Sequence, residues 1–213
     1  MLFNQLRETN KVEYYNLTSH LLGLILAIVG MFILVSKIGI QDLNASFISI
    51  LIFSFSSIIV YTASCLYHYK WNSPSKKVYR TIDHIAIFFL IAGTYTPFTL
   101  ITFEEEAGLR LLYIIWGLAF AGSVFKLFFT GKFENFSIIF YVLMGWTVLI
   151  EVDTFVRSTP ETTLDLLVIG GFLYCTGVVF YRWKKLTYNH VIWHFFVIAA
   201  NFFHWLAVLS IIE

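Results

Sequence analysis

The chain alternates between long apolar runs and short polar segments, and this pattern predicts membrane-spanning helices. Each run is about 20 residues long, the length with which an α-helix crosses the hydrocarbon core of a bilayer. The predicted helices cover residues 18–37, 47–69, 80–101, 109–129, 136–151, 163–182 and 189–211. The fifth run is interrupted by Glu151 and Asp153, so this helix is expected to need residues of the following loop. Because all connections are short, we predict an all-α protein in which residues 1–213 form a single seven-helix transmembrane domain.

The composition supports an integral membrane protein. Hydrophobic residues make up 59% of the 213 positions and charged residues only 13%, whereas soluble domains have roughly 25% charged residues. The formal net charge is +1 and there is no basic stripe, so membrane lipids rather than nucleic acid are the expected partners. No cleavage pattern follows the first apolar run, and no removed targeting peptide is expected. The two cysteines lie in separate apolar runs, and no disulfide is expected.

The basic residues predict the orientation of the chain in the membrane. Most of the 14 lysines and arginines flank the side that holds the N-terminus. They are Arg7, Lys11, Lys70, Lys76, Lys77, Arg80, Lys126, Lys132, Arg182, Lys184 and Lys185. The other side has Lys37, Arg110 and Arg157. By the positive-inside rule we expect a cytoplasmic N-terminus, and seven spans then leave the C-terminus outside.

The last apolar run contains a polar stripe. His190, His194, Asn201 and His204 share one face of a helix with 3.6 residues per turn. Imidazoles that faced lipid would be costly, so this stripe is expected to face the interior of the bundle. His190 and His194 are one turn apart and can bind one metal ion, whereas His204 lies about 15 Å deeper. The alternative is that such histidines only form hydrogen bonds between helices.

Other polar residues are predicted to lie at the same depth, because successive helices run in opposite directions. The clusters at the cytoplasmic helix ends are Glu13, Asn16 and His20; Ser64 and His68; Asp83 and His84; and His190 and His194. Imidazole nitrogens are common metal ligands, and we predict that His68, His190 and His194 bind Zn²⁺. Three ligands leave a fourth tetrahedral position open for water, as in catalytic zinc sites.

Two further residues are predicted to take part in catalysis. Asp83 would accept a proton from the attacking water or fix its position, and Ser64 would donate a hydrogen bond to a developing oxyanion. Glu13, Asn16 and His20 are expected to contact the ligands rather than the metal. Glu13 and Asn16 also suit a helix entrance as caps or interface anchors.

In combination, these motifs resemble those of a known family. They are Glu13-x-x-Asn16-x-x-Ser19-His20, Ser64-x-x-x-His68, Asp83 followed by Ile-Ala-Gly-Thr-Tyr-Thr-Pro97, and His190-x-x-x-His194. The chain resembles the hemolysin III branch of the progestin and adiponectin receptor family over essentially its whole length. The resemblance implies a seven-helix fold with an intracellular N-terminus, and a zinc ion bound by His68, His190 and His194.

The resemblance extends to the alkaline ceramidases, a group of metal-dependent hydrolases of lipid amide bonds. Their Ser, His and Asp pattern matches Ser64, His68 and Asp83. The outer loops are too short for a hormone-binding surface, so no protein hormone is expected, and a form in the bacterial plasma membrane fits better. The leading hypothesis is a zinc-dependent hydrolase of lipid amide or ester bonds. The alternative is a cytolytic or membrane-homeostasis protein in which zinc is structural.

Overall fold

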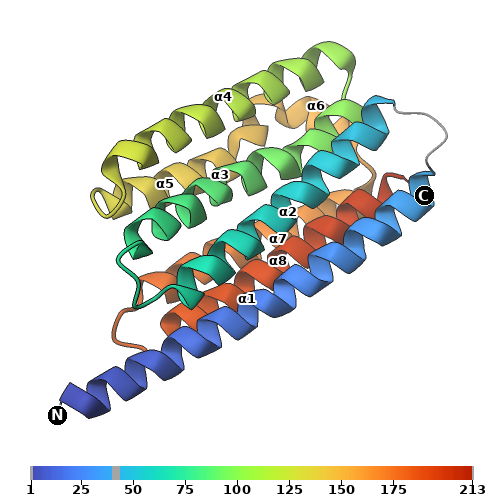
Figure 1. Cartoon of the computed structure of the whole chain (residues 1–213). Coiled ribbons are helices and arrows are strands. Elements are labelled where there is room, and N and C mark those ends of the chain that lie inside the picture. Colours follow the sequence, from blue (N-terminus) through green and yellow to red (C-terminus); the bar gives the residue numbers. More distant parts are fainter. Residues whose placement is uncertain (1, 40–43, 213) are drawn as a thin grey trace.

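The computed structural model describes residues 2–39 and 44–212, with side chains from Asn10 onward, and this part of the chain is helical (Figure 1). The elements are α1 (Leu2–Ile38), α2 (Ala45–Tyr69), α3 (Lys76–Ile101), α4 (Glu105–Phe129), α5 (Glu134–Gly145), the 3₁₀ helix η1 (Thr147–Glu151), α6 (Val152–Ser158), α7 (Glu161–Arg182) and α8 (Asn189–Ser210). No strand occurs in the described ranges.

Seven segments of the described chain are long and apolar enough to cross a membrane, which confirms the predicted number of spans. The main difference in length is in α1, which begins at Leu2 rather than at residue 18, while its apolar span begins at Asn10. The polar segment before the apolar run contains neither glycine nor proline, so nothing in it interrupts the helix. This extension carries Glu13 and Asn16 on α1 itself.

The fifth span runs from Glu134 to Ser158 through α5, η1 and α6, so it continues beyond residue 151 into the following segment, as the interrupted apolar run led us to expect. The Glu151 carboxylate accepts a hydrogen bond from Arg110 Nε at 2.5 Å, which offsets the cost of an acidic side chain within the span. The Tyr95 hydroxyl accepts a hydrogen bond from Val148 N at 3.1 Å and lies 2.7 Å from the Gly145 carbonyl oxygen. These contacts provide partners for backbone groups at the break in the helix.

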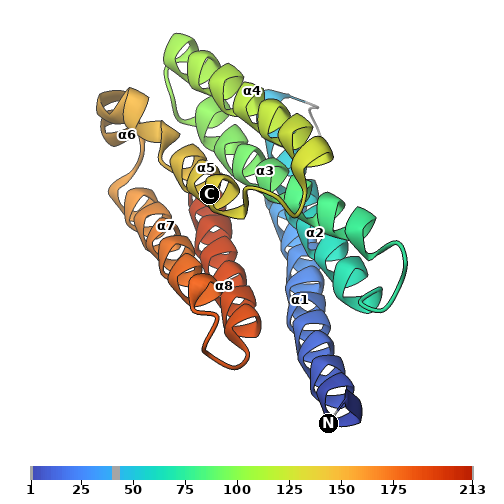
Figure 2. The ribbon, with the colours of Figure 1, turned by 90° about the vertical axis from the view of Figure 1, so that its left-hand side faces the viewer.

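Neighbouring helices pack side by side to form the bundle. The most extensive contacts join α7 to α8, α2 to α3, α1 to α2 and α3 to α4, and α1 also packs against α8. Helix α5 contacts both α3 and α7 (Figure 2). The two ends of the chain lie at opposite ends of the bundle, as an odd number of spans requires (Figure 1). The predicted cytoplasmic location of the N-terminus stays a prediction.

The two ends of the bundle differ in their buried side chains. Leu34, Phe53, Phe98 and Val208 belong to an apolar cluster toward the end where the chain finishes. The first turns of α8 and the last turn of α2 lie toward the opposite end, and they carry the paired histidines and His68. Antiparallel packing therefore brings these polar helix ends together.

Candidate metal centre

Three histidines from two helices form a compact group. One ring nitrogen from each of His68, His190 and His194 lies within 4.8 Å of the others. The ring centroids of His190 and His194 are 4.5 Å apart, and each lies 5.1 Å from that of His68. His68 is in the last turn of α2, and the other two are one turn apart at the start of α8. This arrangement could hold a metal ion, since imidazole nitrogens are suitable ligands.

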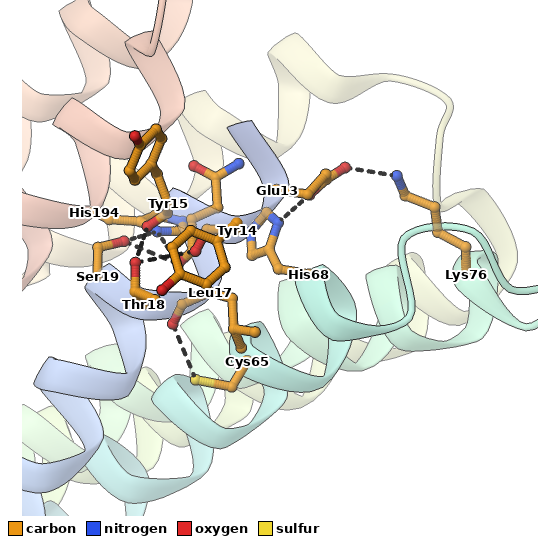
Figure 3. A network of polar contacts seen from close by, with 11 residues as sticks. Glu13, Tyr14, Tyr15, Leu17, Thr18, Ser19, Cys65, His68, Lys76 and His194 are labelled. Carbon is orange, nitrogen blue, oxygen red and sulfur yellow. Dashed lines mark hydrogen bonds and ion pairs between the residues drawn. The ribbon is translucent and has the colours of Figure 1, made fainter. Parts of the chain in front are cut away.

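The environment of His68 leaves one of its ring nitrogens available. Its Nδ1 atom lies 2.6 Å from Glu13 Oε2, and the other oxygen of Glu13 accepts a hydrogen bond from Lys76 Nζ at 2.9 Å (Figure 3). His68 Nε2 is buried and has no hydrogen-bond partner among the described residues. Because an unsatisfied buried imidazole nitrogen is unfavourable, a metal ion there would supply the missing partner. Glu13 thus directs His68 through its opposite nitrogen.

His194 is also held through its Nδ1 atom by groups on α1. Its Nδ1 atom lies 3.1 Å from the Asn16 carbonyl oxygen and 2.9 Å from Ser19 Oγ (Figure 3). The Ser19 hydroxyl itself donates to the Asn16 carbonyl at 2.9 Å. A protonated Nδ1 satisfies the carbonyl, which leaves Nε2 with a free lone pair for a metal. Helix α1 therefore orients a histidine on α8 as well as one on α2.

His20 lies beside the group but is not one of the three. Its ring stacks on that of His194, with centroids 3.5 Å apart and planes inclined by 16°. Both of its ring nitrogens are buried without a hydrogen-bond partner in the described structure, and so is Asn16 Oδ1. The structure thus places Asn16 and His20 against the ligand set, where the sequence pattern predicts them. Their roles there stay predictions.

Asp83 and Ser64 also reach this region. The Ser64 hydroxyl lies near the Asp83 carboxylate, to which it could donate a hydrogen bond. Both line the cavity that His190 and His194 line. Ser64 and Asp83 therefore face the same space, and the predicted roles of Ser64 as oxyanion donor and of Asp83 as proton acceptor stay predictions.

The cavity is a long, mainly apolar space inside the bundle. Its volume is about 380 Å³, and its lining comes mostly from α3, the α5–α6 span, α7 and α8. Trp146 and Val168 are among the lining residues, although they are 49% and 64% exposed at the surface of the protein. The cavity therefore reaches the apolar outer surface between the fifth span and α7, where lipid chains would surround the protein.

The remaining two histidines lie elsewhere. His84 Nδ1 is 3.8 Å from Glu134 Oε2 and is not one of the three grouped histidines. His204 Nε2 donates to the Leu167 carbonyl oxygen at 3.3 Å and so joins α8 to α7. His204 is not part of the three-histidine group, and its predicted separation from metal binding stays a prediction.

Two residues in this region were not predicted to contribute. Ser19, which contacts His194, appears in the sequence only as part of a motif, although its position three residues after Asn16 was a usable signal. Lys76, which contacts Glu13, lies 63 residues away from it in sequence. The sequence analysis used Lys76 only to predict the membrane orientation, and it could not predict this contact.

These features define a seven-helix membrane protein with a buried three-histidine group between α2 and α8. Residues 8–205 match the model of the family described as "Haemolysin-III related", and the chain belongs to this family. The seven apolar helices and the bacterial relatives show a multi-pass integral membrane protein, as predicted. They support a location in the bacterial plasma membrane.

The relatives come from bacteria and animals. "Hemolysin-3" of Bacillus cereus is 36% identical over 199 residues, which cover 93% of this chain and 91% of the relative. The "Hemolysin-3 homolog" of Bacillus subtilis (strain 168) is 39% identical over 198 residues, or 92% of this chain and 93% of the relative. The human "Monocyte to macrophage differentiation factor" is 28% identical over 158 residues, 70% of this chain and 64% of the relative. No solved structure matches the chain significantly.

Proposed function

We propose that the protein is a zinc-dependent hydrolase of amide or ester bonds in membrane lipids. The observation that carries this proposal is that His190, His194, Asp83 and Ser64 all line one apolar cavity. Three histidine ligands with an open fourth position are typical of catalytic zinc sites, and a carboxylate beside them suits a general base. An apolar cavity beside these groups suits an acyl chain.

Each residue of the site has a separate role in the proposed hydrolysis. When bound, zinc would lower the pKa of a water molecule and polarise the substrate carbonyl. Asp83 accepts the proton of the attacking water and returns it to the leaving group. Ser64 lines the cavity beside Asp83 and donates a hydrogen bond to the developing oxyanion, and Glu13 holds His68 in the orientation that leaves Nε2 without a protein partner.

The position of the site suits a lipid substrate. The three histidines lie at the helix ends, where the headgroup region would meet the bundle, so a linkage between headgroup and acyl chain would lie at their depth. The lining residues Trp146 and Val168 are exposed on the outer surface, which supports entry of the chain from the membrane rather than from water.

The test compares wild type with Asp83→Asn. Both proteins are incubated in detergent micelles or liposomes with ceramides and other acyl lipids, and free fatty acid is measured by mass spectrometry. We expect wild type to release fatty acid and the variant to be slower by about 10² or more, because it lacks the general base. The variant should keep its zinc, since the histidines remain. Asp165→Asn, an exposed residue on α7, is the matched control and should remain active.

A failure to release fatty acid from any lipid class, with zinc fully bound, would contradict the hydrolase proposal. The names of the Bacillus relatives then favour the second candidate, a cytolytic or membrane-homeostasis protein with structural zinc. Its signature would be dye release from liposomes by wild type and by Asp83→Asn alike, without release of fatty acid.

A further inference from the structure

A second buried polar cluster lies between α3, α4 and α5, apart from the three-histidine group. Its centre is Glu134, in the first turn of α5. Arg80 Nη2 lies 3.3 Å from Glu134 Oε1, and Lys126 Nζ lies 3.5 Å from Glu134 Oε2. His84 Nδ1 lies 3.8 Å from the same Oε2 atom. One carboxylate is therefore shared by Arg80 and Lys126, so that one positive charge remains when both are protonated and His84 is neutral.

Lys126 is the most poorly satisfied member of this cluster. Its side chain has 0% exposure, and its Nζ atom has no hydrogen bond in the described structure. An ammonium group has three donors, and the single contact with Glu134 is long. His84 Nδ1 is also buried without a hydrogen-bond partner. A buried charge is costly unless it is paired and hydrogen-bonded, so these atoms favour a ligand that brings negative charge and several acceptor oxygens.

Arg80 connects the cluster to the outside, and His84 and Glu134 connect it to the cavity, while Lys126 itself is buried. The Arg80 side chain is 36% exposed, and His84 and Glu134 line the same cavity as His190 and His194. A headgroup bound near Arg80 could therefore extend its acyl chain into the cavity. The two polar clusters would then contact two parts of one molecule.

Another basic residue, Lys184, lies beside the cavity near Tyr181. Lys184 Nζ lies 4.1 Å from the centre of the Tyr181 ring, which also lines the cavity. Burial, together with the nearby charges of Arg182 and Arg80, lowers the pKa of Lys184. Burial is the larger cause of this lowering, and an anion would also offset the smaller effect of the two arginines.

We infer that Arg80 and Lys126 bind the phosphate group of an anionic membrane lipid whose acyl chain occupies the cavity. A phosphodiester has one negative charge and free oxygens, which match the one unpaired charge and the unused donors of Lys126. As a statement about substrate, this rests on the proposed hydrolase function, and it favours phospholipids over ceramide, which has no phosphate. As a statement about binding, it is testable without turnover.

The test measures lipid binding to the zinc-loaded Asp83→Asn protein, so that no substrate is consumed. Phosphatidylglycerol, phosphatidylcholine and inorganic phosphate are compared by native mass spectrometry and by their effect on the melting temperature in detergent. We expect a preference for phosphatidylglycerol, and we expect Lys126→Met to weaken it about tenfold or more, because a charge-assisted hydrogen bond is lost. Lys132→Met, which changes an exposed lysine near the same end of α4, is the control and should bind like the parent protein.

Two additional variants separate ligand binding from structural support. Arg80→Gln changes a partly exposed residue, and it should also weaken the preference even if Lys126→Met does not fold. Glu134→Gln removes the competing carboxylate and should strengthen phosphatidylglycerol binding. If the cluster only stabilises the fold, Glu134→Gln lowers the melting temperature without improving binding, and the inference is wrong.

Other results would also overturn it. Equal affinity for phosphatidylglycerol and phosphatidylcholine in the parent protein would contradict an anionic-lipid site. Full displacement of the lipid by inorganic phosphate would assign the cluster to a free anion instead. If phosphatidylglycerol binds as expected but the wild type does not hydrolyse it, the binding site stands and the hydrolase function fails.

Discussion

In His68 and His194, hydrogen bonds on the far side of the imidazole determine which nitrogen faces the candidate metal position. Glu13 engages Nδ1 of His68, and the Asn16 carbonyl engages Nδ1 of His194. The sequence predicts the three histidines by their depth in the membrane, but it could not show these contacts. They depend on how α1 is rotated against α2 and α8, and helical spacing alone does not define that rotation.

The contact between Glu13 and His68 predicts that Glu13 supports metal binding. Glu13→Gln removes the charge that orients His68, and we expect metal affinity to fall about 10- to 100-fold, as for other residues that hold a metal ligand in place. Competition with a chelator measures this affinity. Glu161→Gln, an exposed glutamate at the start of α7, is the control. Unchanged affinity in Glu13→Gln would mean that Glu13 serves only as an anchor for Lys76 at the helix entrance.

At the scale of elements, packing between helices explains what the apolar pattern could not. The sequence pattern interrupts the fifth span at Glu151, and it could not show how the span continues beyond this residue. The partner that neutralises it, Arg110, lies on α4 and 41 residues away in sequence. The Tyr95 hydroxyl at the break in this span comes from α3. Such long-range partners are invisible to a window of about 20 residues.

The α7–α8 contact gives an element-scale prediction. A Cβ atom added at Gly170 would lie 2.3 Å from His204 Cδ2, whereas one added at Gly171 would meet nothing within 4 Å. We expect Gly170→Ala to destabilise the fold by about 1–3 kcal/mol through overpacking. Gly171→Ala should be neutral, or stabilising by up to about 1 kcal/mol through helix propensity. Thermal unfolding in detergent compares the two, and equal melting temperatures would show that α7 and α8 are not packed as described.

At the scale of the whole molecule, a metal ion would join helices from opposite ends of the sequence. His68 belongs to α2 and the paired histidines to α8, while α1 contacts ligands from both. The alternation of helix direction was enough to predict this convergence from sequence. The charge distribution also predicts a cytoplasmic location for this end, and a reporter fused after Glu213 should then be active outside the cytoplasm.

The metal content of the purified protein tests the central claim most directly. Wild type purified without added metal should contain about one zinc ion per chain, and chelation should lower its melting temperature, because an ion bound only to the folded state stabilises it. His68→Ala, His190→Ala and His194→Ala should each lose the zinc, whereas His204→Ala, whose ring contacts Leu167, should keep it. A folded wild type without bound metal that takes up no zinc when it is supplied, or equal zinc loss in His204→Ala, would contradict the account.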